Sequence, residues 1–199
     1  MKSARITRLL PLSLALLLAL FLTACGPSNT VRLISPAPAV NPVLPAPNAP
    51  RVTVVPFADK RQDTSNLGVR RDGSAFVASE DVAQWVSRGL ADELRRQGVQ
   101  VSYAMDESQA RSGNPDYIVT GTLEQAWLRE VSATELATSM RATYRLASRS
   151  GRVTKETLNS SQNRSGLPTS DAAEEIMVSS LRELVQPMAR KIKAIVDGK

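Results

Sequence analysis

The 199-residue sequence contains no histidine and a single cysteine, Cys25. Without histidine, the chain cannot form a Ser-His-Asp or Cys-His nucleophilic site of the usual kind. The same absence removes most zinc and transition-metal sites, for which imidazole is a standard ligand. The sequence also lacks the Gly-x-Gly-x-x-Gly and Walker A patterns that cradle nucleotide phosphates. We therefore expect a protein that is not an enzyme and that binds neither a metal ion nor an organic cofactor.

The carboxylates do not supply an alternative catalytic centre. An enzyme without histidine would need paired carboxylates or a Ser-Lys arrangement in one cleft. No two of the candidate acids have a spacing that predicts a common cleft, so we interpret them as solvated surface groups. These acids are Asp59, Asp63, Asp72, Asp92, Glu93, Asp116, Glu124 and Glu135.

The 25 basic residues outnumber the 19 acidic residues, but they are scattered along the chain. Three of them lie within the first eight positions, so the remaining chain has 22 basic residues and a net charge of +3. Short basic pairs such as Arg70-Arg71 and Arg95-Arg96 are not interleaved with aromatic residues. Because nucleic-acid binding usually needs a basic stripe, we expect no nucleic-acid partner.

Residues 1–24 have the pattern of a cleaved export signal. Lys2, Arg5 and Arg8 form a positive start, and residues 9–22 are almost wholly apolar. This run is shorter than the roughly 20 apolar residues that span a bilayer as a helix. A charged start, a short apolar run and then small residues are typical of a secretory signal peptide. An uncleaved signal anchor is the alternative interpretation.

The position of Cys25 indicates a lipid anchor. The motif Leu22-Thr23-Ala24-Cys25 resembles the lipobox of bacterial lipoproteins, in which the thiol is acylated and the chain is cut just before it. The resemblance implies several acyl chains on Cys25 and therefore permanent membrane attachment. Gly26 follows, where an Asp would favour inner-membrane retention in enterobacteria. The resemblance thus implies the periplasmic face of the outer membrane, with the inner membrane as the alternative.

Residues 25–50 are predicted to be a lipidated cysteine followed by a linker. Seven prolines mixed with Ala, Asn and Ser cannot bury a core and favour extended polyproline geometry. At about 3.1 Å per residue, such a linker reaches at most roughly 75 Å. The linker either lifts the folded domain off the membrane or is simple slack.

Residues 51–199 are long enough for one folded periplasmic domain. Residues 51–57 are rich in β-branched side chains and predict a strand, while the Asp72-Gly73 pair predicts a hairpin turn. A helix is predicted from an N-cap at Ser79 to a stop at Gly98. Its apolar positions recur at helical spacing and place Trp85 in the core.

The second half of the domain predicts a sheet and a long helix. Segments 117–131, 140–147 and 153–161 alternate between two faces and predict three antiparallel strands, the last near a sheet edge. A helix begins near residues 169–171, and Pro187 must kink or split it. The economical arrangement is an α+β domain, in which a mainly antiparallel sheet carries two amphipathic helices on one face.

Three pairs of charged residues are candidates for partner binding. Asp59 and Arg61 follow the first strand and either brace each other or leave the arginine for a partner's acidic group. Arg70 and Arg71 enter the predicted hairpin, which is a candidate contact loop. Arg141 and Arg145 share one face of a strand, where they either bind an acidic partner or are ordinary water-facing residues.

Several motifs together resemble the YajG-type lipoproteins. In chain order they are the Leu22-Thr23-Ala24-Cys25 motif with its Pro-rich spacer, Val54-Val55-Pro56-Phe57-Ala58-Asp59-Lys60-Arg61, Leu67-Gly68 and Leu90-Ala91-Asp92-Glu93-Leu94-Arg95-Arg96-Gln97-Gly98. With the three-strand run and the terminal helix, the resemblance covers roughly residues 20–195. It implies an envelope lipoprotein of this fold, and it carries no activity over to particular residues.

The sequence thus predicts a non-enzymatic lipoprotein that binds or assembles another component of the cell envelope, with an envelope protein as its partner. The alternative is an accessory lipoprotein subunit of an envelope ABC transport system for lipid, since such subunits share this layout. A lipid-handling subunit should have an apolar groove between sheet and helices. A binding factor should instead expose a polar patch, which the face of Arg141 and Arg145 could supply.

Overall fold

The computed structural model describes residues 29–36 and 43–198. The predicted signal peptide and the predicted lipidation site, Cys25, lie outside the described residues. Within the described part of the chain, no helix is both long enough and apolar enough to cross a membrane.

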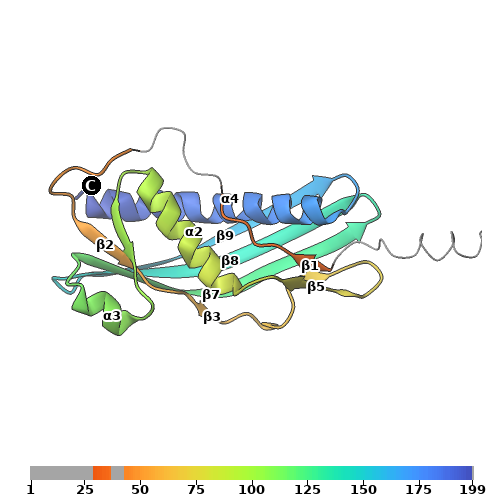
Figure 1. The fold of residues 1–199 in the computed structure, drawn as a ribbon, viewed down its shortest axis with the longest axis horizontal. Coiled ribbons are helices and arrows are strands. Elements are labelled where there is room, and N and C mark those ends of the chain that lie inside the picture. The colour runs from red at the N-terminus through yellow and green to blue at the C-terminus, as the bar shows by residue number, and fades with distance from the viewer. Residues whose placement is uncertain (1–28, 37–42, 199) are drawn as a thin grey trace, which may run out of the picture.

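Three long antiparallel strands form the body of the sheet (Figure 1). They are β7 (Tyr117–Ser132), β8 (Glu135–Ser148) and β9 (Val153–Ser165). β8 pairs with β7 on one side and with β9 on the other, in register over almost their full lengths. In the described chain β9 pairs only with β8, so it is an edge strand, as its polar sequence predicts.

Six short strands complete the sheet. They are β1 (Thr30–Val31), β2 (Arg51–Val54), β3 (Ala58–Asp59), β4 (Gly68–Val69), β5 (Ala75–Ala78) and β6 (Gln100–Tyr103). β2, β3 and β4 each pair in parallel with β7, β6 pairs in parallel with β2, and β1 pairs in parallel with β5. β4 and β5 form the predicted antiparallel hairpin, with Gly73 at a positive φ of 86°.

The α+β class is confirmed, but the prediction of a mainly antiparallel sheet is wrong. Five of the eight strand pairings among the described residues are parallel, so the sheet is mixed. Side-chain alternation shows which face of a strand is buried, but it carries no information about the direction of the neighbouring strand.

Two long helices pack on one face of the sheet, as predicted (Figure 1). The helix α2 (Val82–Arg96) begins after an N-cap at Asp81 and not at the predicted Ser79. The Asp81 carboxylate accepts a hydrogen bond from the Gln84 N–H at 2.7 Å. α4 (Ser170–Val196) begins after Thr169 and continues through Pro187 without being split. A short helix, α3 (Glu107–Ser112), was not predicted.

The core lies between these two helices and the sheet. The apolar stripe predicted for α2 is buried, including Trp85, and it meets the buried faces of α4, β7 and β8. Gly89 of α2 has no room for a side chain, because an added Cβ would lie 2.8 Å from a methyl of Leu181 on α4. This close approach allows the two helices to pack directly against each other.

Residues 29–36 pack onto the domain, although the sequence predicts them to be part of the linker. Thr30 and Val31 pair with β5, and the side chains of Val31 and Leu33 are buried in the core. The Trp85 indole donates a hydrogen bond to the Ile34 carbonyl at 3.1 Å. Val31 and Leu33 alternate with exposed residues, and this short pattern is enough to add a strand to the sheet. The strand was not predicted because the surrounding region is rich in proline.

The packing of residues 29–36 predicts a large effect from Leu33→Ala. The side chain is 4% exposed, so its truncation leaves a cavity and should lower the free energy of unfolding by about 2–4 kcal/mol. Chemical denaturation of the purified domain measures this change. Leu44→Ala, at a side chain that is 81% exposed in the same Pro-rich region, is the matched control and should change stability little. Equal effects of the two substitutions would contradict the packing.

Candidate functional site

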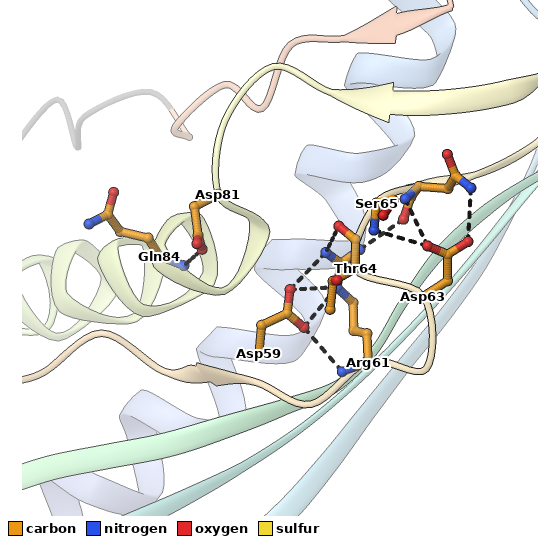
Figure 2. Close-up of polar contacts among 8 residues, drawn as sticks. Asp59, Arg61, Asp63, Thr64, Ser65, Asp81 and Gln84 are labelled. Atoms are coloured by element: carbon orange, nitrogen blue, oxygen red, sulfur yellow. Dashed lines mark hydrogen bonds and ion pairs between the residues drawn. The ribbon is translucent and has the colours of Figure 1, made fainter.

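Asp59 and Arg61 form a local ion pair at the exit of β3 (Figure 2). Arg61 donates to both carboxylate oxygens of Asp59, with Nη2 at 2.8 Å from Oδ2. Its remaining N–H groups donate to the carbonyls of Thr64 and Asn66 at 3.2 and 3.1 Å. Because the arginine is only 8% exposed and its guanidinium bonds both Asp59 and two loop carbonyls, the pair braces the loop of residues 60–67.

A second carboxylate stiffens the same loop. Asp63 accepts hydrogen bonds from the backbone N–H groups of Ser65 and Asn66 and from the Asn66 side chain, at 2.9 to 3.0 Å (Figure 2). The hydrogen bonds from Asn66 hold the pKa of Asp63 below its usual value. The loop is therefore held in one shape by two acidic residues, one on each side of Arg61.

This rigid loop leaves a gap beside β7. The Lys60 N–H bonds the Leu123 carbonyl, and the Leu128 N–H bonds the Leu67 carbonyl, so β3 and β4 pair with β7 on either side of residues 124–127. A cavity of about 800 Å³ lies at this gap. It is lined by Arg61, Gln62, Asp63, Glu124, Gln125, Ala126 and Trp127.

Glu124 is the unusual residue of this cavity. It lies at a bulge, where the register of β7 against β8 shifts between Leu123 and Gln125. Thr122 donates to Glu124 Oε1 at 2.5 Å, whereas Oε2 is buried and has no hydrogen-bond partner among the described residues. The prediction that all candidate acids are solvated is wrong for Glu124 and for Glu93, which is buried on α2 beside Arg96.

The face of β7, β8 and β9 that points away from α2 and α4 is mostly open and polar, and α3 packs against it at Ile118. Arg129, Arg141, Arg145 and Lys155 are exposed on this open face, and Trp127 is half-buried among them. None of these four cations makes a side-chain hydrogen bond or an ion pair within the described chain. The surrounding positions are mostly hydroxyl and amide side chains: Thr120, Thr122, Gln125, Ser139, Thr143, Thr157, Asn159, Ser161 and Asn163.

Two of these cations face each other directly. Arg145 of β8 lies opposite Lys155 of β9, and Thr120 of β7 lies on the other side of Arg145. Like charges at directly opposed positions of a sheet destabilise it. Glu107 of α3 and Asp116 line the same cavity as Arg145, but they pair with Arg111 and Arg149, so neither cation has an ion pair among the described residues. The open face therefore carries a repulsion that a bound anionic group would relieve.

The helix-facing side of β9 shows the opposite arrangement. Glu156 pairs with Lys191 of α4 and accepts a hydrogen bond from the Tyr144 hydroxyl at 3.1 Å. Burial, together with the charge of Glu156, raises the pKa of Tyr144. Arg164 pairs with Glu175 of α4. Charged residues of one strand are thus neutralised on the covered side and left unpaired on the open side.

The hairpin arginines have separate roles. Arg70 is buried and stacks over the ring of Phe76. It donates a hydrogen bond to Asn29 Oδ1 at 2.8 Å and lies 3.5 Å from a carboxylate oxygen of Glu130. Arg71 is exposed at the hairpin. Arg70 therefore ties the N-terminal segment to β7, while Arg71 is available to a partner.

The six predicted residues do not form one site. Arg141 and Arg145 share the open face, Asp59 and Arg61 brace the loop beside β7, and the third pair belongs to the β4–β5 hairpin. A partner-binding role for these residues stays a prediction. Arg129 and Lys155 complete the open face but were not singled out, although the alternation of their strands places them there.

Breaking the Asp59–Arg61 pair should destabilise the domain. Asp59→Ala leaves the buried guanidinium without its carboxylate, and we expect the free energy of unfolding to fall by about 2–3 kcal/mol. Asp92→Ala is the matched control, because its pair with Arg95 is exposed on α2 and should contribute less than about 1 kcal/mol. Thermal and urea unfolding measure both variants. An unchanged stability of Asp59→Ala would refute the bracing role.

No protein-family model matches the chain, and no curated protein matches it. Among solved structures, the chain is similar to protein XCC0632 from Xanthomonas campestris, described as DUF330, with a TM-score of 0.59 and 13% identity over 86% of this chain and 97% of that one. A protein described as uncharacterized has a TM-score of 0.54 and 11% identity, over 82% and 99% of the two chains.

A third similar structure is lipoprotein GNA1162 from Neisseria meningitidis, with a TM-score of 0.40 and 14% identity over 67% of this chain and 96% of that one. This likeness is too distant to support an inference. The resemblance to YajG-type lipoproteins stays a prediction, because none of these three proteins is described as one. The first two similarities establish that the α+β fold described above occurs in other solved proteins.

Proposed function

We propose that the chain is a non-enzymatic lipoprotein of the bacterial envelope, and that it binds the acidic surface of another envelope protein. Acyl chains on Cys25 attach it to the periplasmic face of the outer membrane. The attachment rests on the export signal and on the motif Leu22-Thr23-Ala24-Cys25. The choice of membrane rests on Gly26.

The unpaired cations of the open face are the observation that carries the binding role. Arg145 and Lys155 oppose each other and neither is in an ion pair within the described chain, because the nearby acids Glu107 and Asp116 pair with other arginines. Arg129 and Arg141 extend the positive charge along the strands. A local arrangement that costs stability and has no structural purpose is typical of a functional site. Polar side chains and one half-buried tryptophan between the cations supply hydrogen bonds and contact area for a protein partner.

The space between the sheet and the helices favours this role over lipid transport. A lipid-handling subunit would need an apolar groove there, whereas the interface is filled by buried side chains. These include Leu136, Met140 and Leu146 of β8 and Met177, Leu181, Leu184 and Met188 of α4. The polar patch that distinguishes the binding factor is present on the opposite face of the same strands.

In-cell crosslinking of the full-length lipidated protein, followed by affinity purification and mass spectrometry, tests the proposal. A protein with an acidic surface should be captured by the wild type and lost from the double variant Arg141→Glu/Arg145→Glu. Arg182→Glu/Arg190→Glu is the matched control, because these two arginines are also exposed and unpaired, but lie on α4. A Cys25→Ala variant, which cannot be lipidated, identifies proteins that are crosslinked only because they lie in the same membrane.

Two results of this experiment would overturn the proposal. Equal capture by the two double variants would show that the open face does not bind the partner. Specific recovery of ABC transporter subunits would instead support the role of an accessory subunit.

Lys155→Glu should increase stability while weakening partner capture. The substitution replaces a repulsive cross-strand pair by an attractive one with Arg145, so we expect the free energy of unfolding to rise by about 0.5–1 kcal/mol at low salt. Lys191→Glu is the control, because it places a second carboxylate beside Glu156 and should lower stability. Urea unfolding at low and high salt measures both changes. A Lys155→Glu protein of lower stability would contradict the repulsion.

A further inference from the structure

Residues 29–36 are held to the rest of the folded domain. The Asn29 side chain accepts a hydrogen bond from Arg70, and its carbonyl accepts one from the Val77 N–H at 2.9 Å. Thr30 and Val31 then pair with β5. Cys25 precedes Asn29 by only four residues, which span at most about 14 Å when fully extended. This reach is far shorter than that of the predicted linker.

Three turns surround the point where the chain enters the domain. They are the β4–β5 hairpin at residues 70–74, the β7–β8 turn at residues 133–134 and the β9–α4 loop at residues 166–169. The Gly166 N–H donates to the Thr134 carbonyl at 2.9 Å, and Arg70 pairs with Glu130 near the end of β7. Figure 1 shows these turns at the end of the sheet that also carries β1 and β5, opposite α3 and the C-terminus.

This end presents apolar side chains to the outside. Leu167 of the β9–α4 loop is 71% exposed and Val131 of β7 is 40% exposed. The charges beside them have mixed signs, since Arg71 is next to Asp72 and Arg129 is near Glu135. Scattered exposed apolar residues are normal on a protein surface. These differ because they lie at the end of the domain that a lipidated Cys25 would hold within about 14 Å of a bilayer.

We propose that this end of the domain rests on the lipid surface, with Leu167 and Val131 in contact with it. The inference depends on the lipid anchor of the proposed function and adds the orientation of the domain. β8 runs from this end to the opposite one, and its 14 residues span about 46 Å. The long strands therefore stand upright on the membrane. The open face points sideways into the periplasm, with Arg129 nearest the lipid and Arg145 and Lys155 furthest from it.

A single added cysteine tests this orientation. Cys25 is the only cysteine of the sequence and is acylated in the anchored protein, so a second cysteine is the only free thiol. We choose Leu167→Cys and, as the matched control, Val153→Cys. Val153 is also exposed, at 48%, but lies at the start of β9, at the opposite end of the sheet. Each full-length lipidated variant is labelled with the fluorophore NBD and reconstituted into phosphatidylethanolamine–phosphatidylglycerol vesicles.

The proposal predicts a blue-shifted label at residue 167 that is several-fold less accessible to a water-soluble quencher than the label at residue 153. A long Gly-Ser insertion between Cys25 and Asn29 should abolish this difference while the protein still floats with the vesicles. Equal quenching of the two labels in vesicle-bound protein overturns the orientation but not the anchor. Failure of the protein to float with vesicles overturns the anchor itself, and the orientation with it.

Discussion

The edge of β7 that faces away from β8 determines where most of the short strands lie. β2, β3 and β4 pair in parallel with successive parts of this edge, and β6 and β5 are added through β2 and β4. Gly121 of β7 permits this arrangement, because an added Cβ would lie 2.7 Å from the ring of Phe57. Between β3 and β4, residues 124–127 of this edge have no strand partner in the described chain, because the loop braced by Arg61 leaves the sheet there, and the cavity beside Glu124 lies at this point. The same backbone edge thus builds the domain and borders the cavity beside Glu124.

The two faces of the long strands follow different electrostatic rules. On the covered face, the cost of burying polar groups is offset by partners from α4, such as Lys191 for Glu156 and Glu183 for Ser160. On the open face, water solvates the cations, so they can remain unpaired at a modest cost in stability. A partner surface with acidic groups could replace that water. This difference explains why the proposed binding residues lie on a face that contributes little to the core.

The proposed anchor and the open face are related through the short N-terminal segment. Arg70 joins this segment to Glu130 of β7, so the position of the chain entry is coupled to the end of the long strands. With only three residues between Cys25 and Asn29, the proposed lipid anchor would leave the domain little freedom to turn over on the membrane. In the proposed orientation, a partner meets Arg145 and Lys155 well away from the lipid headgroups. An acidic protein would therefore not have to approach an anionic bilayer closely.

Local sequence determined the helical stripe of α2, the Asp72-Gly73 turn and the alternation of the three long strands, because each of these depends on residues close together in the chain. Composition alone excluded chemistry that needs histidine. Whether Arg61 braced Asp59 or stayed free was left open by the sequence and was decided by the loop that folds its carbonyls onto the guanidinium. The parallel pairing of the short strands, the inclusion of residues 29–36 in the core and the buried oxygen of Glu124 were decided by tertiary structure alone. The physical reason is that alternation specifies which side of a strand is buried, whereas strand direction, neighbours and burial depth depend on segments far away in the chain.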